Sequence, residues 1–334
     1  MQIGGQAVVE GVMMRAPGSV ATAVRRANGS IVVKQQAFTS LTEKYKFLNV
    51  PILRGAVGLI DMLYLGIQTL NWSGEVAMMD LPEKKNGSNG NGTPAKTPRK
   101  KQTNLGLILS LVLALGLGLA IFFVAPLFIT TKVFQLEQTA FAFNLVAGII
   151  RIAMFLVYLL AISFLNDIHR LFQYHGGEHK AVFAFELKDD LLPEIVQQRS
   201  RFHPRCGTSF LLIVMFVAII SFAFLDVFIK QLVGTMTLPI RLATHLPFIP
   251  VVGGLSYEII RFSAKHSSTW WGRILVAPGL WLQRVTTKEP DRSQVEVAIV
   301  ALRCALGLDD PLNYPLRQTV ALEAEISSFP LQHR

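Results

Sequence analysis

Between Leu105 and Ile129 the chain is almost entirely apolar and contains no Asp, Glu, Lys, Arg or His. About 20 apolar residues in a helix, each rising 1.5 Å, cross the hydrocarbon core of a bilayer. A helix in a soluble core rarely carries apolar residues on every face. The pattern therefore predicts a membrane-spanning helix.

Three later apolar stretches have a similar length. They cover about Asn144 to Leu165, Thr208 to Ile229 and Leu238 to Ile260. The chain is therefore predicted to be a mainly α membrane protein, with about four transmembrane helices in a bundle over residues 105–260.

Some of these stretches contain charged residues, namely Arg151 in the second and Arg241 and Glu258 in the fourth. Charge is costly in lipid, so these side chains should face the bundle interior or the membrane surface. The fourth stretch is also interrupted over Pro247 to Gly254, and such breakers need surrounding protein or a water-filled cavity. We therefore expect the fourth span to be broken.

Residues 1–50 show a different periodicity, which predicts a small β-rich unit. Ser19 to Arg26 and Ser30 to Phe38 are extended runs joined through Asn28-Gly29, a pair that favours a tight hairpin because both residues tolerate positive φ. The preceding run, Ile3 to Arg15, combines β-branched residues with glycines, which indicates strand and close backbone approach.

The segments between this unit and the bundle differ in polarity. Residues 51–72 are mainly apolar but include Arg54 and Asp61, which favours a helix at the membrane interface or against the bundle, with a full span as the alternative. Residues 83–104 are rich in Asn, Gly, Pro, Thr and Lys, which is typical of a flexible basic linker.

After the spans, residues 261–310 predict two elements and residues 311–334 a tail. Trp270 to Trp281 is short for a span and contains three tryptophans, which concentrate at the membrane interface. A helix should follow, capped by Asp291 with Gln294 as its capping-box partner and ended at Gly307.

The distribution of basic residues predicts the orientation. Residues 1–104 carry 13 Lys and Arg, the segment 166–207 carries six and the chain from Arg261 onward carries nine, whereas 130–143 and 230–237 carry one each. Basic residues gather on the cytoplasmic side. We therefore expect a multi-pass protein of the plasma membrane with both termini and the segment 166–207 in the cytoplasm.

Composition narrows the classes further. The net charge of +10 could suggest a nucleic-acid-binding protein, but basic loops account for it in a membrane protein and no RNA-binding aromatic motif is present. We therefore expect no nucleic-acid partner. Cys206 and Cys304 are the only cysteines, which suits a reducing compartment. The first residues lack the pattern of a signal peptide, so we expect no cleaved leader.

Candidate chemistry gathers in the segment 166–207. On a helix, His175 and His179 would project from one face, with Glu178 beside them. This H-x-x-E-H spacing occurs in reversed-motif zinc peptidases, where two imidazoles bind the metal and the Glu moves protons. His203 and Cys206 follow as candidate third and fourth ligands, since imidazole and thiolate are preferred by zinc.

The pair Gly176-Gly177 leaves the local geometry open. Each glycine costs a helix about 1 kcal/mol relative to Ala, so the pair could end or bend the helix, or let a substrate phosphate or carbonyl approach the backbone. A closed set of three histidines and a cysteine favours a structural metal, whereas catalysis needs an open position. The alternative is a polar loop whose histidines bind water, lipid headgroups or carboxylates.

Five separated stretches, in one order, resemble a known family. They are Gly4 to Arg15, Phe172 to Lys180, His203 to Phe210, Gly254 to Arg261 and Thr286 to Asp291. The chain resembles the bacterial membrane family called domain of unknown function 1385, whose members are described as predicted metal-dependent enzymes. The resemblance implies a shared site that includes His175, Glu178, His179, His203 and Cys206. The family usually has Gly-Ala where this chain has Gly176-Gly177.

The leading hypothesis is a metal-dependent enzyme, a hydrolase, with its site at the cytoplasmic membrane surface. Its divalent metal, zinc by the donor set, would be bound by His175, His179, His203 and Cys206, with Glu178 as the catalytic general base. Glu10, Arg15 and Glu258 are candidates to complete the pocket. For Glu10 and Arg15 the preferred alternative is a structural ion pair, and for Glu258 the alternative is an ion pair or a position near a helix end.

The position of this site at the bilayer suggests a lipid, a lipid-linked molecule or a membrane protein as substrate. Two alternatives stay open: a membrane scaffold or assembly factor with a structural metal or none, and a transporter, for which a broken fourth span would be typical. The pattern gives no oligomeric state.

Overall fold

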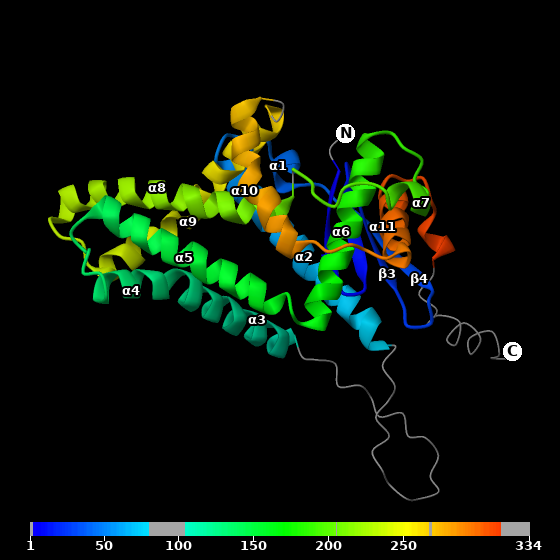
Figure 1. The fold of residues 1–334 in the computed structure, drawn as a ribbon, viewed down its shortest axis with the longest axis horizontal. Coiled ribbons are helices and arrows are strands. Elements are labelled where there is room, and N and C mark those ends of the chain that lie inside the picture. The colour runs from blue at the N-terminus through cyan, green and yellow to red at the C-terminus, as the bar shows by residue number, and fades with distance from the viewer. Residues whose placement is uncertain (1–2, 80–103, 205, 267–268, 315–334) are drawn as a thin grey trace, which may run out of the picture.

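The computed structural model describes residues 3–79, 104–204, 206–266 and 269–314. Most of the linker predicted over 83–104 and of the tail over 311–334 lies outside these residues. The described chain is mainly helical and contains one antiparallel sheet. Long apolar helices lie side by side in one half of the molecule, and the sheet lies with α6 and α11 in the other (Figure 1).

The sheet confirms the predicted hairpin and extends it to four strands. They are β1 (Gly4–Val8), β2 (Gly11–Ala16), β3 (Ser19–Arg25) and β4 (Ile31–Ala37), in that spatial order. Gly29 has a φ of 84° in the turn between β3 and β4, the left-handed conformation that glycine adopts without strain. Side chains alternate between the two faces of a strand, so Val12 and Met14 of β2 pack in one apolar core, whereas Met13 packs in another on the opposite face of the sheet.

Helices cover both faces of this sheet. On one side lie α6 (Asn166–Glu186) and α11 (Arg292–Ala305), which share an apolar core with the strands. On the other side lies α2 (Leu53–Met79), through Leu65 and Val76. The predicted capping box of α11 is present, because Asp291 accepts from the backbone of Gln294 and the Gln294 side chain accepts from the backbone of Asp291.

Among the described residues, four helices are long and apolar enough to cross a membrane, as the sequence predicts. The first combines α3 (Asn104–Leu119), η2 (Ala120–Val124) and α4 (Ala125–Lys132), and the others are α5 (Ala140–Ile162), α8 (Gly207–Val233) and α9 (Leu238–Lys265). The apolar candidate spans within them are Val112–Lys132, Ala140–Ile162, Phe210–Val233 and Leu238–Ser263. The chain is an integral, multi-pass membrane protein.

The expectation of a broken fourth span is wrong. Helix α9 runs without interruption from Leu238 to Lys265 and contains both Pro247 and Pro250. Surrounding helices tolerate proline in a span, because they supply the packing and polar contacts that the freed backbone needs.

Arg151 of the second span hydrogen-bonds to a backbone carbonyl in an irregular turn of the first span. Pro126 has no N–H, so the carbonyl of Phe122, four residues earlier, lacks its usual helical partner. The chain forms a turn of π-helix there, and Arg151 Nε donates to that carbonyl at 3.0 Å. Arg151 therefore faces the bundle interior, as its cost in lipid requires.

A second charge cluster joins three spans. Asp226 of α8 and Arg241 and His245 of α9 are fully buried. One oxygen of Asp226 accepts from Arg241 Nε at 2.8 Å and from the Asn144 amide of α5 at 2.7 Å, and the other lies 2.7 Å from His245 Nε2. Helix α8 continues beyond the predicted end near Ile229 to Val233, so Asp226 lies within the bundle.

Two helices lie between the bundle and the sheet, namely α2 and α10 (Trp270–Thr286) (Figure 1). Near its start α2 packs closely on α9, since a Cβ at Gly55 would lie 2.9 Å from the backbone of Gly254. Arg54 and Glu258 link the same helices through two side-chain hydrogen bonds. That residues 51–72 are interfacial stays a prediction.

The segment 166–207 is largely ordered as helix rather than loop. Helix α6 occupies its first half, and the short helix α7 (Pro193–Val196) follows. Smaller elements complete the described chain: α1 (Leu41–Lys44), η1 (Lys46–Leu48) and η3 (Pro311–Asn313).

Candidate metal centre

Helix α6 passes through Gly176-Gly177 without ending. A Cβ at Gly176 would lie 2.1 Å from the backbone oxygen of Lys288, so the segment after α10 lies directly on the helix there. At Gly177 a Cβ would have its nearest neighbour, the Gln294 oxygen, at an ordinary 3.5 Å. The first glycine is therefore required by close approach, whereas the second is not.

The two glycines should consequently respond differently to alanine. Gly176→Ala should displace the chain at Lys288 and destabilise the protein by about 1–3 kcal/mol, the usual cost of overpacking. Gly177→Ala should be neutral or stabilise it by up to about 1 kcal/mol, because alanine is the better helix former. Unfolding of the two purified variants in SDS–detergent micelles measures both effects.

Gly177→Ala is also the matched control for that comparison, because it makes the same chemical change on the next residue. It reproduces the Gly-Ala pair that the resembled family usually has. Equal destabilisation by the two substitutions would contradict the close contact at Lys288.

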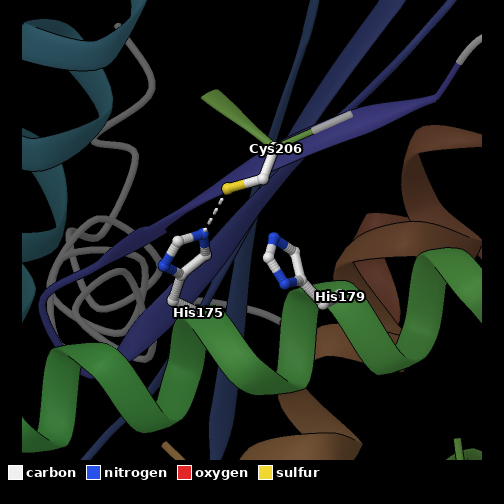
Figure 2. A group of neighbouring side chains, drawn as sticks. All are labelled: His175, His179 and Cys206. Atoms are coloured by element: carbon white, nitrogen blue, oxygen red, sulfur yellow. Dashed lines mark hydrogen bonds between the residues drawn. The ribbon is translucent and has the colours of Figure 1, made fainter. Parts of the chain in front are cut away.

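His175 and His179 project from one face of α6, as their spacing predicts, with ring centroids 4.5 Å apart (Figure 2). His175 Nδ1 lies 2.8 Å from the Thr286 backbone oxygen, and His179 Nδ1 lies 2.5 Å from that of Arg201. A carbonyl oxygen only accepts, so each Nδ1 must donate, and a neutral ring then keeps its lone pair on Nε2. Protein zinc ligands are oriented in this way.

Cys206 meets these rings from another part of the chain. It caps the N-terminus of α8, and its Sγ accepts from the backbone N–H of Thr208 at 3.4 Å. His175 Nε2 lies 3.2 Å from the same sulfur (Figure 2). The amide groups and dipole at the start of α8 favour negative charge at this position.

One ligand atom from each of these three residues lies within 4.8 Å of the others. With Zn–N near 2.0–2.1 Å and Zn–S near 2.3 Å, ligand atoms around tetrahedral zinc lie about 3.3–3.8 Å apart. Small side-chain movements would therefore bring His175, His179 and Cys206 to zinc distance. Two imidazoles and a thiol are also the donors that zinc prefers.

His203 lies beside this group rather than within it. Its ring centroid is 5.7 Å from that of His179, and its Nε2 is 3.4 Å from a Glu186 oxygen. Gln283 of α10 fixes its backbone, accepting from the His203 N–H and donating to the His203 oxygen, both at 2.8 Å. Burial, together with the nearby His179, lowers the pKa of His203 to about 4, which keeps the ring neutral.

Glu178 is buried next to the group. One of its oxygens lies 3.5 Å from His179 Nε2, and the Gly5 backbone N–H donates to its carboxylate. Burial raises the pKa of Glu178 to about 7, against opposing effects of His175 and the Gly5 N–H. Gly5 is itself required, because a Cβ there would lie 2.8 Å from Glu178 Cγ.

These side chains enclose a cavity of about 80 Å³. Such a volume holds an ion with a few water-sized groups, and a larger substrate would enter only with its reacting end. The lining comes from β1, α6 and the approach to α8, and consists of Ile3, Gly4, Gly5, His175, Glu178, His179, Val182, His203, Cys206 and Gly207.

Three candidates to complete the pocket do not line it. Glu10 instead pairs with Arg170 and accepts from the Tyr174 hydroxyl, and the Arg15 guanidinium lies over the Phe38 ring. Glu258 pairs with Arg54, an interaction that raises the arginine's pKa. Each charge therefore has another partner, and that hypothesis is wrong.

Several residues that support the site were not predicted. Gly5 belongs to the Gly-Gly start of the N-terminal motif, and Thr286 to the Thr-Thr-Lys-Glu-Pro-Asp motif, so the resemblance contained a signal for both. Arg201 and Thr286 act through backbone carbonyls, which any residue could supply. Nothing in the sequence indicated that Gln283 would hold His203.

Comparison with known proteins supports a family assignment. A family model described as "Protein of unknown function (DUF1385)" matches residues 50–308. The chain is also 34% identical over 317 residues to the "Uncharacterized protein YqhQ" of Bacillus subtilis (strain 168), covering 92% of each chain. No solved structure matches. Neither description names a metal or an activity, so the metal dependence implied by the resemblance is unsupported by them.

Proposed function

This chain belongs to the family described as "Protein of unknown function (DUF1385)", and we propose from the geometry of its site that it is a metal-dependent membrane enzyme, a hydrolase that binds zinc. The observation that carries the proposal is the common orientation of three ligands. The Nδ1–H groups of His175 and His179 each donate to a backbone carbonyl, which leaves both Nε2 atoms free to bind a metal. Both rings line the cavity that Cys206 also lines.

Three protein ligands leave a fourth position open, which is the arrangement of catalytic rather than structural zinc. A bound zinc ion would supply Lewis acidity that polarises a carbonyl or phosphoryl oxygen of the substrate. Glu178 faces the same cavity and acts as the general base, taking a proton from the attacking water. Its raised pKa matches a group that exchanges protons near neutral pH.

The site's place in the fold indicates where the substrate comes from. Cys206 caps the span helix α8 and Gly207 begins it, which supports a cavity that opens beside the membrane surface. A lipid, a lipid-linked molecule or a membrane protein reaches this position without leaving the bilayer. The excess of Lys and Arg outside the bundle supports a cytoplasmic position for this side and for both termini, and we propose the plasma membrane as the location.

One observation favours a second candidate, a scaffold or assembly factor with a structural metal. His203 lines the cavity and its ring lies next to that of His179, so a modest movement would add it as a fourth ligand. Four protein ligands close a zinc site and leave no position for chemistry. The transporter alternative loses its main support, because α9 is continuous.

The variant Glu178→Gln separates the enzyme from the scaffold. The purified protein in lipid nanodiscs should contain about one zinc per chain, and Glu178→Gln should retain it, because Glu178 lies beside the ligand group and not in it. Incubation with solubilised bacterial membranes, followed by mass spectrometry of their lipids and proteins, should show products that Glu178→Gln does not form. Wild-type protein without stoichiometric metal would refute the metal site. Metal retained without any product difference would favour the scaffold.

A further inference from the structure

Helix α10 carries a continuous apolar stripe on its outer side. Trp270, Ile274, Ala277 and Trp281 follow one another at intervals of three and four residues, so they lie on one face of the helix. All four are exposed, with 74% of Trp270 and 53% of Trp281 accessible. Two large aromatic rings without protein cover indicate a surface that another phase or molecule contacts.

The charges on the same helix are of one sign. Arg273 and Arg284 are exposed, and α10 contains no Asp or Glu. Within the described residues, neither guanidinium is paired with a carboxylate. An amphipathic helix with tryptophan on its apolar face and arginine beside it is typical of elements that lie in the headgroup region of an anionic leaflet.

The opposite side of α10 is anchored on the spans. Leu282 is fully buried and packs in a cluster with Phe155 of α5 and Leu212 of α8. Figure 1 shows α10 running across the end of the bundle rather than along it. Its exposed stripe therefore lies at the end of the apolar spans, where the surface of a bilayer would be, and this favours the bilayer over a soluble partner as what it contacts.

The end of the same helix supports the metal centre. Gln283 holds both backbone groups of His203, and the Thr286 oxygen receives the Nδ1–H of His175. The apolar stripe and these supports belong to one helix, so a shift of α10 at the membrane moves the groups that orient His175 and His203.

We propose that α10 binds the anionic lipid leaflet next to the sheet through Trp270, Trp281, Arg273 and Arg284, and that this contact tightens the metal centre through Gln283 and Thr286. The proposed contact of α10 with the membrane depends only on its apolar stripe and arginines, whereas its proposed effect on metal binding rests on the proposed function. The partner is an anionic lipid surface, and its role is to make the site fully formed only in the membrane.

The first experiment tests the position of α10 by tryptophan quenching. One variant keeps Trp281 as its single tryptophan and a matched variant keeps Trp72 of α2, which packs toward the sheet. In nanodiscs containing brominated lipid and one protein copy, Trp281 should be quenched clearly more than Trp72, and most strongly by bromine near the headgroups. If brominated lipid left Trp281 unquenched, the stripe would face a second copy or another protein, and the proposal would fail.

The second experiment tests the coupling through release of Zn²⁺ to a chelator. Release from wild type should be slower, by at least about threefold, in nanodiscs with phosphatidylglycerol than in phosphatidylcholine alone, because basic residues near an anionic surface bind it. The double variant Arg273→Gln/Arg284→Gln should abolish this difference. Arg292→Gln, an exposed arginine of α11 away from the bundle, should retain it.

A readout without metal separates the two proposals. In metal-free protein, the rate of maleimide labelling at Cys206, identified by peptide mapping, should also differ between the two lipids and become equal in the double variant. Different labelling rates in a protein that never takes up Zn²⁺ would refute the metal site but support the coupling. If neither the rate of Cys206 labelling nor the rate of Zn²⁺ release depended on the lipid, the coupling would be overturned, whatever the metal content.

Discussion

Replacement of Asp226 by asparagine should destabilise the protein by about 3–5 kcal/mol, the range for breaking a buried ion pair by removing one partner. The substitution keeps the size of the side chain but removes the charge that faces Arg241, which is fully buried. An uncompensated guanidinium would then lie inside the bundle, where its desolvation is not offset. Unfolding in SDS–detergent mixed micelles gives the free energy directly.

The same pair provides its own control. Arg241→Met in the Asp226→Asn background removes the stranded charge, and should recover much of the loss even though no ion pair is restored. Asp190→Asn, the same change at an exposed position, should stay within about 0.5 kcal/mol of wild type. If Asp226→Asn matched Asp190→Asn, the cluster would not carry the charges that its geometry implies.

This cluster shows what an apolar pattern reveals and what it leaves out. The four spans were predictable because lipid requires long apolar helices, and their ends differ from prediction by only a few residues or turns. The role of Asp226 was not, because a single acid near the end of an apolar run is equally consistent with a helix terminus. Its partners Arg241 and His245 come from the next span, so only the packing of the two helices identifies it.

The same distinction holds in the candidate metal centre. The i, i+4 spacing of His175 and His179 sufficed to predict a shared helix face. The continuity of α6 through Gly176 could not be predicted, because local propensity disfavours it and the compensating contact comes from Lys288, more than 100 residues later. The grouping of His175, His179 and Cys206 was expected from the chemistry of their side chains. The orientation of the two imidazole rings was not, because it depends on the backbone carbonyls of Thr286 and Arg201, and every residue has such a carbonyl.

Loss of His179 should remove zinc from the purified protein. His179 belongs to the three-ligand group, so its replacement by alanine should lower the zinc affinity by more than about 100-fold. In known metal sites, even the loss of a residue that only hydrogen-bonds to a ligand lowers the affinity by about 10–100-fold. Cys206→Ala and His175→Ala should behave alike. Competition with a zinc chelator on the nanodisc-bound variants measures the affinity, and circular dichroism checks that the overall helix content is unchanged.

The decisive comparison is with His203→Ala. His203 lies outside the three-ligand group, with its Nε2 near Glu186, so its loss should weaken zinc binding less than the loss of His179 does. His169→Ala, the same change at an exposed position of α6, should leave zinc binding unchanged. If His203→Ala removed zinc as completely as His179→Ala, the site would have four protein ligands and no open position. The metal would then hold α6 to the start of α8, and the case for a hydrolase would give way to the scaffold.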